Sequence, residues 1–177
     1  MFPLKIRADL QVNSASRKLV LAAVENETPE HLGLKLAAYL LFWDEELIVD
    51  PGLKTAALTG QSFRPDLLGS DITGSVATWV ECGNTSDHKL GKVLRRWPEA
   101  RVVVLKEHPR GARAYRETLQ AKVGKSERVR ILCWPDGAFV EWMRCLSEKT
   151  EIVGEANDSS LNLVVNEQLC MVDMLKC

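Results

Sequence analysis

Two short, largely apolar runs constrain the fold of this chain more than any other feature. Residues 101–105 read Arg-Val-Val-Val-Leu, and residues 129–133 read Val-Arg-Ile-Leu-Cys. Apolar residues at successive positions are typical of strands buried on both faces, as in a parallel sheet. The intervening segment 108–122 begins with His-Pro and carries basic residues along one side, which predicts a helix. This succession of strand, helix and strand indicates an α/β domain.

The first forty-five residues change from one hydrophobic period to another. Apolar and polar residues alternate over 4–12, which predicts a half-buried strand, and 19–24 reads as its partner in a hairpin. Thr28 followed by Pro29 is typical of a helix start, because a hydroxyl caps free N–H groups and proline fits the first turn. We expect this helix to continue to about Glu45.

The rest of the chain shows the same two kinds of pattern without a repeat or a linker. Residues 54–64 are expected to be irregular. The further predicted elements are strands at 47–49, 66–70, 75–82, 150–153, 161–165 and 169–174, and helices at 86–97 and 135–146. The sequence therefore predicts a single mixed α/β domain over residues 1–177.

Composition excludes several classes of protein. The 177 residues carry a net charge of −1, so no overall electrostatic attraction to nucleic acid or to anionic membranes is expected. Residues 1–10 lack the apolar segment of a signal peptide, and the longest apolar run, 36–43, is too short to span a bilayer. Five cysteines without a Cys-x-x-Cys pair favour reduced thiols in a cytoplasmic protein. Oligomeric state is left open.

Two acidic residues are the candidate site. Asp66 follows Pro65 at the start of one expected strand, and Glu81 lies near the end of the strand that returns. Carboxylates held in this way converge on one point, as a hard cation such as Mg²⁺ requires. The alternative interpretation is a polar turn and a capping glutamate, and Asp71 would replace Asp66 if the hairpin register were shifted. The three histidines are far apart and show no spacing typical of metal ligands.

Three blocks of the sequence resemble the YaeQ family. The first is Thr28 to Leu40 with Asp44-Glu45-Glu46-Leu47, which is similar to that family's first-helix block. The second combines Pro65-Asp66, Trp79-Val80-Glu81-Cys82-Gly83 and Lys89-Leu90-Gly91-Lys92, and the third is the closing segment 163–173. The resemblance touches most of the chain and is weakest over 54–64.

The resemblance implies a PD-(D/E)XK restriction-endonuclease-like fold, in which helices flank a central mixed sheet, with added N- and C-terminal β-hairpins. Asp66 and Glu81 would be the two metal-binding acids of that fold, and Glu30 an accessory acid on the first helix. Position 83, where the usual Glu-x-Lys motif has its lysine, is Gly83. The family's compensating pattern places that lysine on the next helix, at Lys92.

Lys89 lies one turn before Lys92 on nearly the same helix face. Lys92 would orient the attacking water and stabilise negative charge, although an ordinary ion pair with Glu81 is the simpler interpretation. An acid in a first helical turn, such as Glu30, also favours the helix dipole without any further role. The implied cofactor is Mg²⁺.

The first functional hypothesis is a metal-dependent nuclease or phosphodiesterase. The alternative is a non-catalytic module that keeps the nuclease-like fold and binds protein or nucleic acid, which the missing lysine favours. A thiol-dependent enzyme at Cys82 has little support, because no Cys-His-Asn pattern lies near it. Nucleic acid is the candidate partner because of a locally basic stretch, which is also compatible with the solvated sides of helices. Its members are Arg95, Arg96, Arg110, Arg113 and Arg116.

Overall fold

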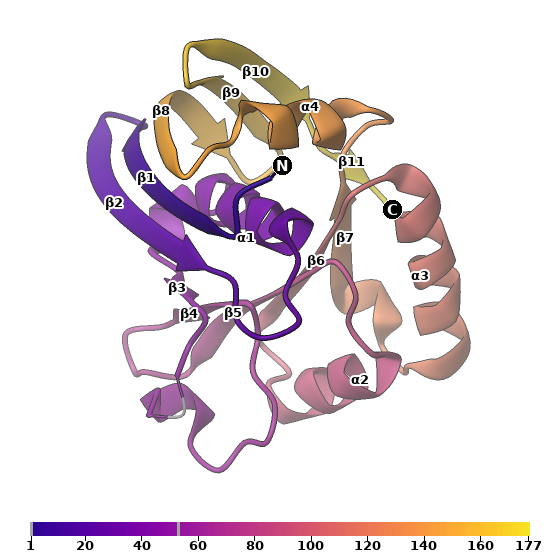
Figure 1. The fold of residues 1–177 in the computed structure, drawn as a ribbon. Coiled ribbons are helices and arrows are strands. Elements are labelled where there is room, and N and C mark those ends of the chain that lie inside the picture. The colour runs from indigo at the N-terminus through magenta and orange to yellow at the C-terminus, as the bar shows by residue number, and fades with distance from the viewer. Residues whose placement is uncertain (1, 53) are drawn as a thin grey trace.

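The chain folds into two β-sheets with a helix between them (Figure 1). The computed structural model describes residues 2–52 and 54–177. Helix α1 (Pro29–Leu41) packs against strands of both sheets, and most of its side chains are buried. The expected mixed α/β architecture is confirmed, and the helices and the hydrophobic core are arranged around these two sheets.

The larger sheet has six strands in the order β11-β7-β6-β5-β4-β3. The expected buried strands at 101–105 and 129–133 are confirmed as β6 and β7, which are parallel to each other, and β6 is parallel to β5. The three other strands pair antiparallel with their neighbours. The strands are β3 (Ile48–Val49), β4 (Leu67–Ser70), β5 (Val76–Cys82), β6 (Arg101–Lys106), β7 (Val129–Cys133) and β11 (Leu175–Lys176).

The smaller sheet has five strands in the order β10-β9-β8-β1-β2. The two expected hairpins are present, and the parallel pairing of β1 with β8 joins them into one sheet. Alternating burial along β1 turns its apolar residues toward α1. Hydrophobic period does not specify which distant strand is the partner, so this pairing was not predicted. The strands are β1 (Lys5–Val12), β2 (Ala15–Ala22), β8 (Lys149–Asn157), β9 (Ser160–Val165) and β10 (Gln168–Asp173).

Three further helices complete the layers. Helices α2 (Asp87–Arg96) and α3 (Pro109–Lys122) share a second core with the face of the larger sheet that points away from α1. Helix α4 (Ala138–Cys145) packs on α1, where the Trp142 indole donates a hydrogen bond to the Gly33 carbonyl at 3.0 Å. A Cβ at Gly33 would overlap the Met143 sulfur, so glycine permits this close approach.

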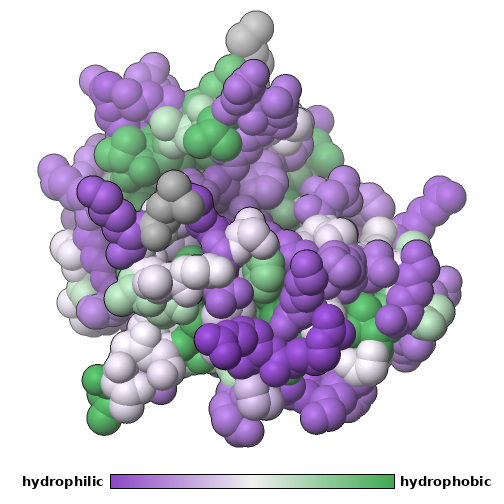
Figure 2. Space-filling model, turned by 90° about the horizontal axis from the view of Figure 1, so that it is seen from below, coloured by the Kyte–Doolittle hydropathy of each residue, from purple (hydrophilic) through white to green (hydrophobic). Residues whose placement is uncertain are grey.

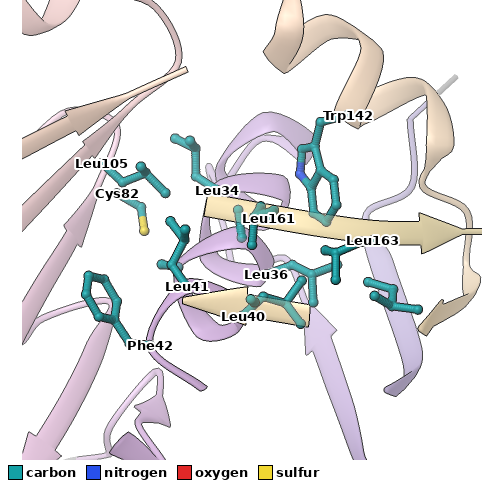
Figure 3. Packing of buried hydrophobic residues seen from close by; sticks show 14 of the residues in the cluster. Leu34, Leu36, Leu40, Leu41, Phe42, Cys82, Leu105, Trp142, Leu161 and Leu163 are labelled. Carbon is teal, nitrogen blue, oxygen red and sulfur yellow. The ribbon is translucent and has the colours of Figure 1, made fainter. Parts of the chain in front are cut away.

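Helix α1 begins where its sequence predicts and ends earlier. The Thr28 hydroxyl accepts a hydrogen bond from the backbone N–H of His31, as a helix cap does. The α-helix ends at Leu41, where Phe42 leaves the helical conformation, and a short 3₁₀ turn, Trp43–Glu45, follows and ends at the left-handed Glu46. Figure 3 shows leucines of α1 lying between residues of both sheets and Trp142 of α4. Residues preceding and following this helix are therefore held at fixed positions beside the larger sheet.

The exposed surface is mainly polar on the face shown in Figure 2. Figure 2 shows that the face seen from below is mostly hydrophilic, with hydrophobic side chains in small separate groups. Among residues 2–52 and 54–177, no helix is long and apolar enough to cross a bilayer.

Candidate functional site

The pairing of β4 with β5 brings the two predicted acids together. The register of β4 with β5 ends at Leu67 opposite Val80, and Asp66 lies one residue before β4. The backbone N–H of Asp66 also donates to the Val80 carbonyl at 3.0 Å. The hairpin thus positions both carboxyl groups at one end of the larger sheet.

Asp66 is bound to α1 and to the following strand. Its Oδ2 accepts the backbone N–H of Cys82 at 2.7 Å, and its Oδ1 lies 2.9 Å from Nε2 of His31. Burial alone would raise the pKa of Asp66, but these hydrogen bonds and the positive charge of His31 outweigh it, so the pKa is lowered. Burial likewise opposes the charged form of His31, and Asp66 outweighs it, so the pKa of His31 is raised.

A row of charged residues at the start of α1 extends this network. His31 and Lys35 are spaced by four residues and lie on one side of the helix. Glu27, two residues before the helix, lies 3.6 Å from the His31 ring and forms an ion pair with Lys35. The Lys35 side chain is 2% exposed and forms ion pairs with Glu27 and, at 2.6 Å, with Asp50. Burial lowers the pKa of Lys35, but its two acidic partners raise it further, with a net rise. Lys35 therefore stays charged.

Glu81 occupies a drier environment. Its side chain is 3% exposed, and its Oε1 accepts the Trp79 indole N–H at 2.7 Å. Nζ of Lys89 lies 2.7 Å from Oε1 and 2.9 Å from Oε2. Burial and the negative charge of Asp66 raise the pKa of Glu81, and Lys89 and Trp79 compensate only in part. Glu81 is thus a carboxylate whose charge depends on one lysine.

Gly83 occupies the position of the missing motif lysine. Its φ of 66° lies in the left-handed region, which glycine adopts without the cost that a side chain brings. The Gly83 carbonyl accepts a hydrogen bond at 2.6 Å from Nζ of Lys106, a buried residue on the neighbouring strand. Cys82 is fully buried, and burial raises its pKa well above the usual value, so it is unsuited to nucleophilic chemistry.

The structure places the other predicted residues differently from the acid pair. Lys92 is exposed on α2, whereas Lys89, one turn earlier, contacts Glu81. Glu30 is half-buried, and within the described part of the chain neither Glu30 nor Lys92 hydrogen-bonds to Asp66 or Glu81. Asp71 caps the turn between β4 and β5 through Thr73 and Ser75 and is exposed.

Sequence reasoning missed four members of the network: Glu27, His31, Lys35 and Asp50. The available signal was the spacing of four between the first three. A buried lysine within a helix whose neighbours are leucine and alanine also indicates a specific acidic partner. Asp50 precedes Pro51 and gave only a turn signal.

Any cation bound by Asp66 and Glu81 would have to keep most of its water. A carboxylate has about four lone-pair sites, and among the described residues His31 and Cys82 donate to those of Asp66. Within 2–52 and 54–177, no three His, Cys, Asp or Glu side chains are grouped as metal ligands. Mg²⁺ commonly binds proteins through one or two carboxylates and retains several waters. Binding here would compete with Lys89 for Glu81.

The basic stretch is only partly a surface feature. Arg95, Arg96, Arg110 and Arg113 are exposed. Arg116 instead turns inward and donates hydrogen bonds to the backbone carbonyls of Ser126, Val129 and Cys177. Four of the five arginines therefore remain free to meet a phosphate backbone.

Comparisons with known proteins identify relatives over the whole fold. The chain is similar to the crystal structure of the YaeQ protein from Xanthomonas axonopodis pv. citri, with a TM-score of 0.74 and 20% sequence identity, covering 98% of this chain and 97% of that one. The YaeQ protein from Pseudomonas syringae gives a TM-score of 0.68 and 17% identity, covering 97% and 93%. A comparison with curated proteins finds no match.

At such identities the two crystal structures show a shared fold. A family model described as "YaeQ protein" matches residues 7–174, which is nearly the whole chain. The matched range includes both predicted acids, the charged row on α1 and the strands that hold them. This chain belongs to the YaeQ family.

Proposed function

We propose that this protein is a metal-dependent phosphodiester hydrolase with a PD-(D/E)XK nuclease-like site, acting on nucleic acid in the cytoplasm. The observation that carries the proposal is that Asp66 and Glu81, both largely buried, lie at the same end of the larger sheet, with Lys89 against Glu81. Five free cysteines support a reducing compartment.

Asp66 and Glu81 would hold the Mg²⁺ ion, which supplies polarisation of the phosphoryl oxygen and an activated water. His31 and the Cys82 N–H fix the orientation of Asp66 and keep it ionised. Lys89 holds Glu81 until a phosphate approaches, and its amine then orients water and balances negative charge. We therefore assign to Lys89 the role that the family pattern gives to Lys92. Exposed arginines near α2 and α3 would contact the phosphate backbone.

Metal binding tests the site directly. Calorimetric titration of the protein with Mn²⁺ or Mg²⁺ is expected to give one site, weakened at least about tenfold in Asp66→Asn and in Glu81→Gln, because each removes a charged ligand. Asp71→Asn changes an exposed acid of the same hairpin and should bind as the unaltered protein does. Equal binding by all four proteins would refute the metal site, provided that circular dichroism shows them folded.

Hydrolysis tests the reaction. Cleavage of DNA or RNA oligonucleotides with Mn²⁺ should fall by about 10²-fold or more in Lys89→Ala, as expected when a charge-stabilising group is lost. Lys92→Ala, on the same helix, serves as the matched control and should keep its activity. The reverse result would restore Lys92 as the acting lysine, and absence of any cleavage would leave the alternative function.

The alternative is a non-catalytic module that binds nucleic acid or protein through the same fold. One specific observation favours it: both acids already have cationic partners, His31 for Asp66 and Lys89 for Glu81. With Gly83 in the lysine position, the site then serves to hold the strands together. This function predicts oligonucleotide binding that is unaffected by chelators and no cleavage with any divalent metal.

A further inference from the structure

Two cysteines that the proposed reaction does not use lie in contact at the far edge of the larger sheet. Cys133 ends β7, and Cys177 follows β11. Their sulfur atoms are 3.8 Å apart, and both are free thiols. Cys133 lies opposite Leu175 in the antiparallel pairing, so Cys177 is its diagonal neighbour on the same face of the sheet.

The backbone around both thiols is anchored. The N–H of Cys177 donates to the Ile131 carbonyl at 3.0 Å. Nε and Nη2 of Arg116 donate to the Cys177 carbonyl at 3.2 and 2.7 Å. The approach of the two sulfur atoms therefore depends on paired strands and a half-buried guanidinium, and a covalent bond has to bring the sulfur atoms from 3.8 Å to about 2.05 Å.

The two thiols differ in access and in local charge. Cys177 is half-exposed and lines a groove of about 460 Å³. Arg113, Arg116 and Lys176 line the same groove, with Glu117 as its acidic member. Cys133 is buried, and burial together with Cys177 raises its pKa to about 12. A reagent in solution meets Cys177 first, and an anionic reagent is favoured.

We propose that Cys177 and Cys133 form a thiol–disulfide exchange site for an anionic, low-molecular-weight disulfide of the glutathione type. The Cys177 thiolate attacks one sulfur of the small disulfide, breaks its S–S bond and releases one small thiolate. In the mixed disulfide the Cys177 thiol no longer raises the pKa of Cys133, and Cys133 loses its proton as its sulfur attacks the Cys177 sulfur and releases the second small thiolate. The small disulfide gains two electrons, and the two protons lost by the cysteines pass to the released thiolates.

The product joins the end of β7 to the residue after β11, within the larger sheet. The chain passes from β10 in the smaller sheet directly to β11 in the larger one, so a Cys133–Cys177 bond fixes that connection to β7. The closed loop contains α4 and strands β8 to β11. Cross-linking a loop of this kind restricts the unfolded chain and stabilises the folded one.

Incubation of the full chain with oxidised glutathione tests the proposal. The main product should have lost two hydrogen atoms in mass, and peptide mapping without reductant should show Cys133 joined to Cys177. Its melting temperature should rise by several degrees and return on addition of dithiothreitol. Cys177→Ser and Cys133→Val should each block the bond, whereas Cys145→Ser, which alters another buried thiol, should leave it unchanged.

The rate of the first exchange step tests whether the basic groove attracts the anionic reagent. Arg113→Glu should slow the first step several-fold at low salt, because it reverses a charge beside Cys177. Arg110→Glu is the matched control on the same helix and should react at the original rate. Equal rates for both variants would overturn the part played by the groove.

The products of the oxidation can also contradict the proposal. A glutathione adduct on Cys177 that never resolves, a bond between Cys145 and Cys170 in preference, or no oxidation at all would each overturn the exchange site.

Discussion

Asp66 and Glu81 lie at the same end of the larger sheet but in opposite electrostatic environments. The Asp66 side chain is 19% exposed and has its pKa lowered, whereas that of Glu81 is 3% exposed and has its pKa raised. Asp66 belongs to a network of several charges along α1. Glu81 depends on Lys89 for charge compensation and on Trp79 for a neutral hydrogen bond.

The difference shows that burial alone does not decide the charge of a carboxyl group. Burial opposes ionisation of both acids, and what differs is the number and kind of donors each one meets. Pairs of acids whose environments push their pKa values apart are typical of sites that handle protons or metal ions. Replacing the lysine on either side, Lys35 beside α1 or Lys89 beside Glu81, tests whether this difference in charge compensation matters for stability.

The largest effect is expected on the α1 side. Lys35→Met should lower the free energy of unfolding by about 3–5 kcal/mol, since it leaves the buried Glu27 carboxylate without its partner. The Lys35 side chain is 2% exposed and that of Glu27 is 7% exposed. Urea denaturation measures the change. Lys18→Met, which removes an exposed pair with Asp9, is the control and should change little.

A small effect of Lys35→Met on the free energy of unfolding would contradict the expectation that the fold needs the ion pair between Lys35 and Glu27. It would mean that Glu27 takes up a proton or reaches water when Lys35 is absent. The double variant Lys35→Met with Glu27→Gln separates these outcomes, because it removes the unpaired charge and should recover much of the lost stability.

On the β5 side the expected effect is smaller and depends on pH. Lys89→Met should cost about 2–3 kcal/mol at pH 8, because Glu81 is then left buried without its cation. The pKa of Glu81 is already raised and rises further in the variant. Stability from a carboxyl group with a raised folded pKa is present at low pH and is lost as pH rises through that value.

Urea denaturation of Lys89→Met and the unaltered protein at pH 5 and pH 8 therefore checks the sign. The difference between the two proteins should shrink toward pH 5, where Glu81 binds a proton in the variant. Lys92→Met, an exposed change on the same helix, should show no such dependence. A pH-independent loss would indicate that packing of the Lys89 side chain, rather than its charge, supports Glu81.

The sequence predicted the fold more completely than the site. The hydrophobic periodicity and the helix-capping residues predicted most elements, including the buried strands β6 and β7 and the start of α1 at Pro29. The joining of β1 with β8 was not predictable, because strand partners far apart in sequence are chosen by tertiary packing. The two acids could be predicted because they belong to one hairpin, whose strand pairing depends on residues close together in the sequence.

The residues that neutralise the two acids could not be predicted from local sequence. Lys89 and Lys92 occupy similar faces of α2, and only the three-dimensional position of the helix decides that Lys89 contacts Glu81. His31 showed no ligand spacing, since its partner Asp66 lies on another element. Ion pairs between elements depend on distances that hydrophobic pattern does not encode.

The smallest effect is expected when the partner of His31 is removed. Asp66→Asn should cost about 1–2 kcal/mol near pH 5–6, because it replaces a charge-assisted hydrogen bond by a neutral one. The raised pKa of His31 stabilises the fold below its unfolded value near 6.5, and this contribution is lost as pH rises through the folded pKa. The lowered pKa of Asp66 stabilises above its unfolded value near 3.9 and is lost as pH falls through the folded pKa.

The difference between Asp66→Asn and the unaltered protein should therefore be largest between these two limits and shrink on either side. NMR titration of the His31 ring protons gives the direct reading, and the pKa of His31 should fall in the variant. His88 is exposed on α2 and provides the internal reference in the same spectra. An unchanged pKa for His31 would show that Glu27, whose carboxylate lies 3.6 Å from the same ring nitrogen, holds the imidazolium instead. The charge of His31 would then be independent of Asp66, and the contrast between Asp66 and Glu81 would rest on the Cys82 N–H and the charge of Lys35.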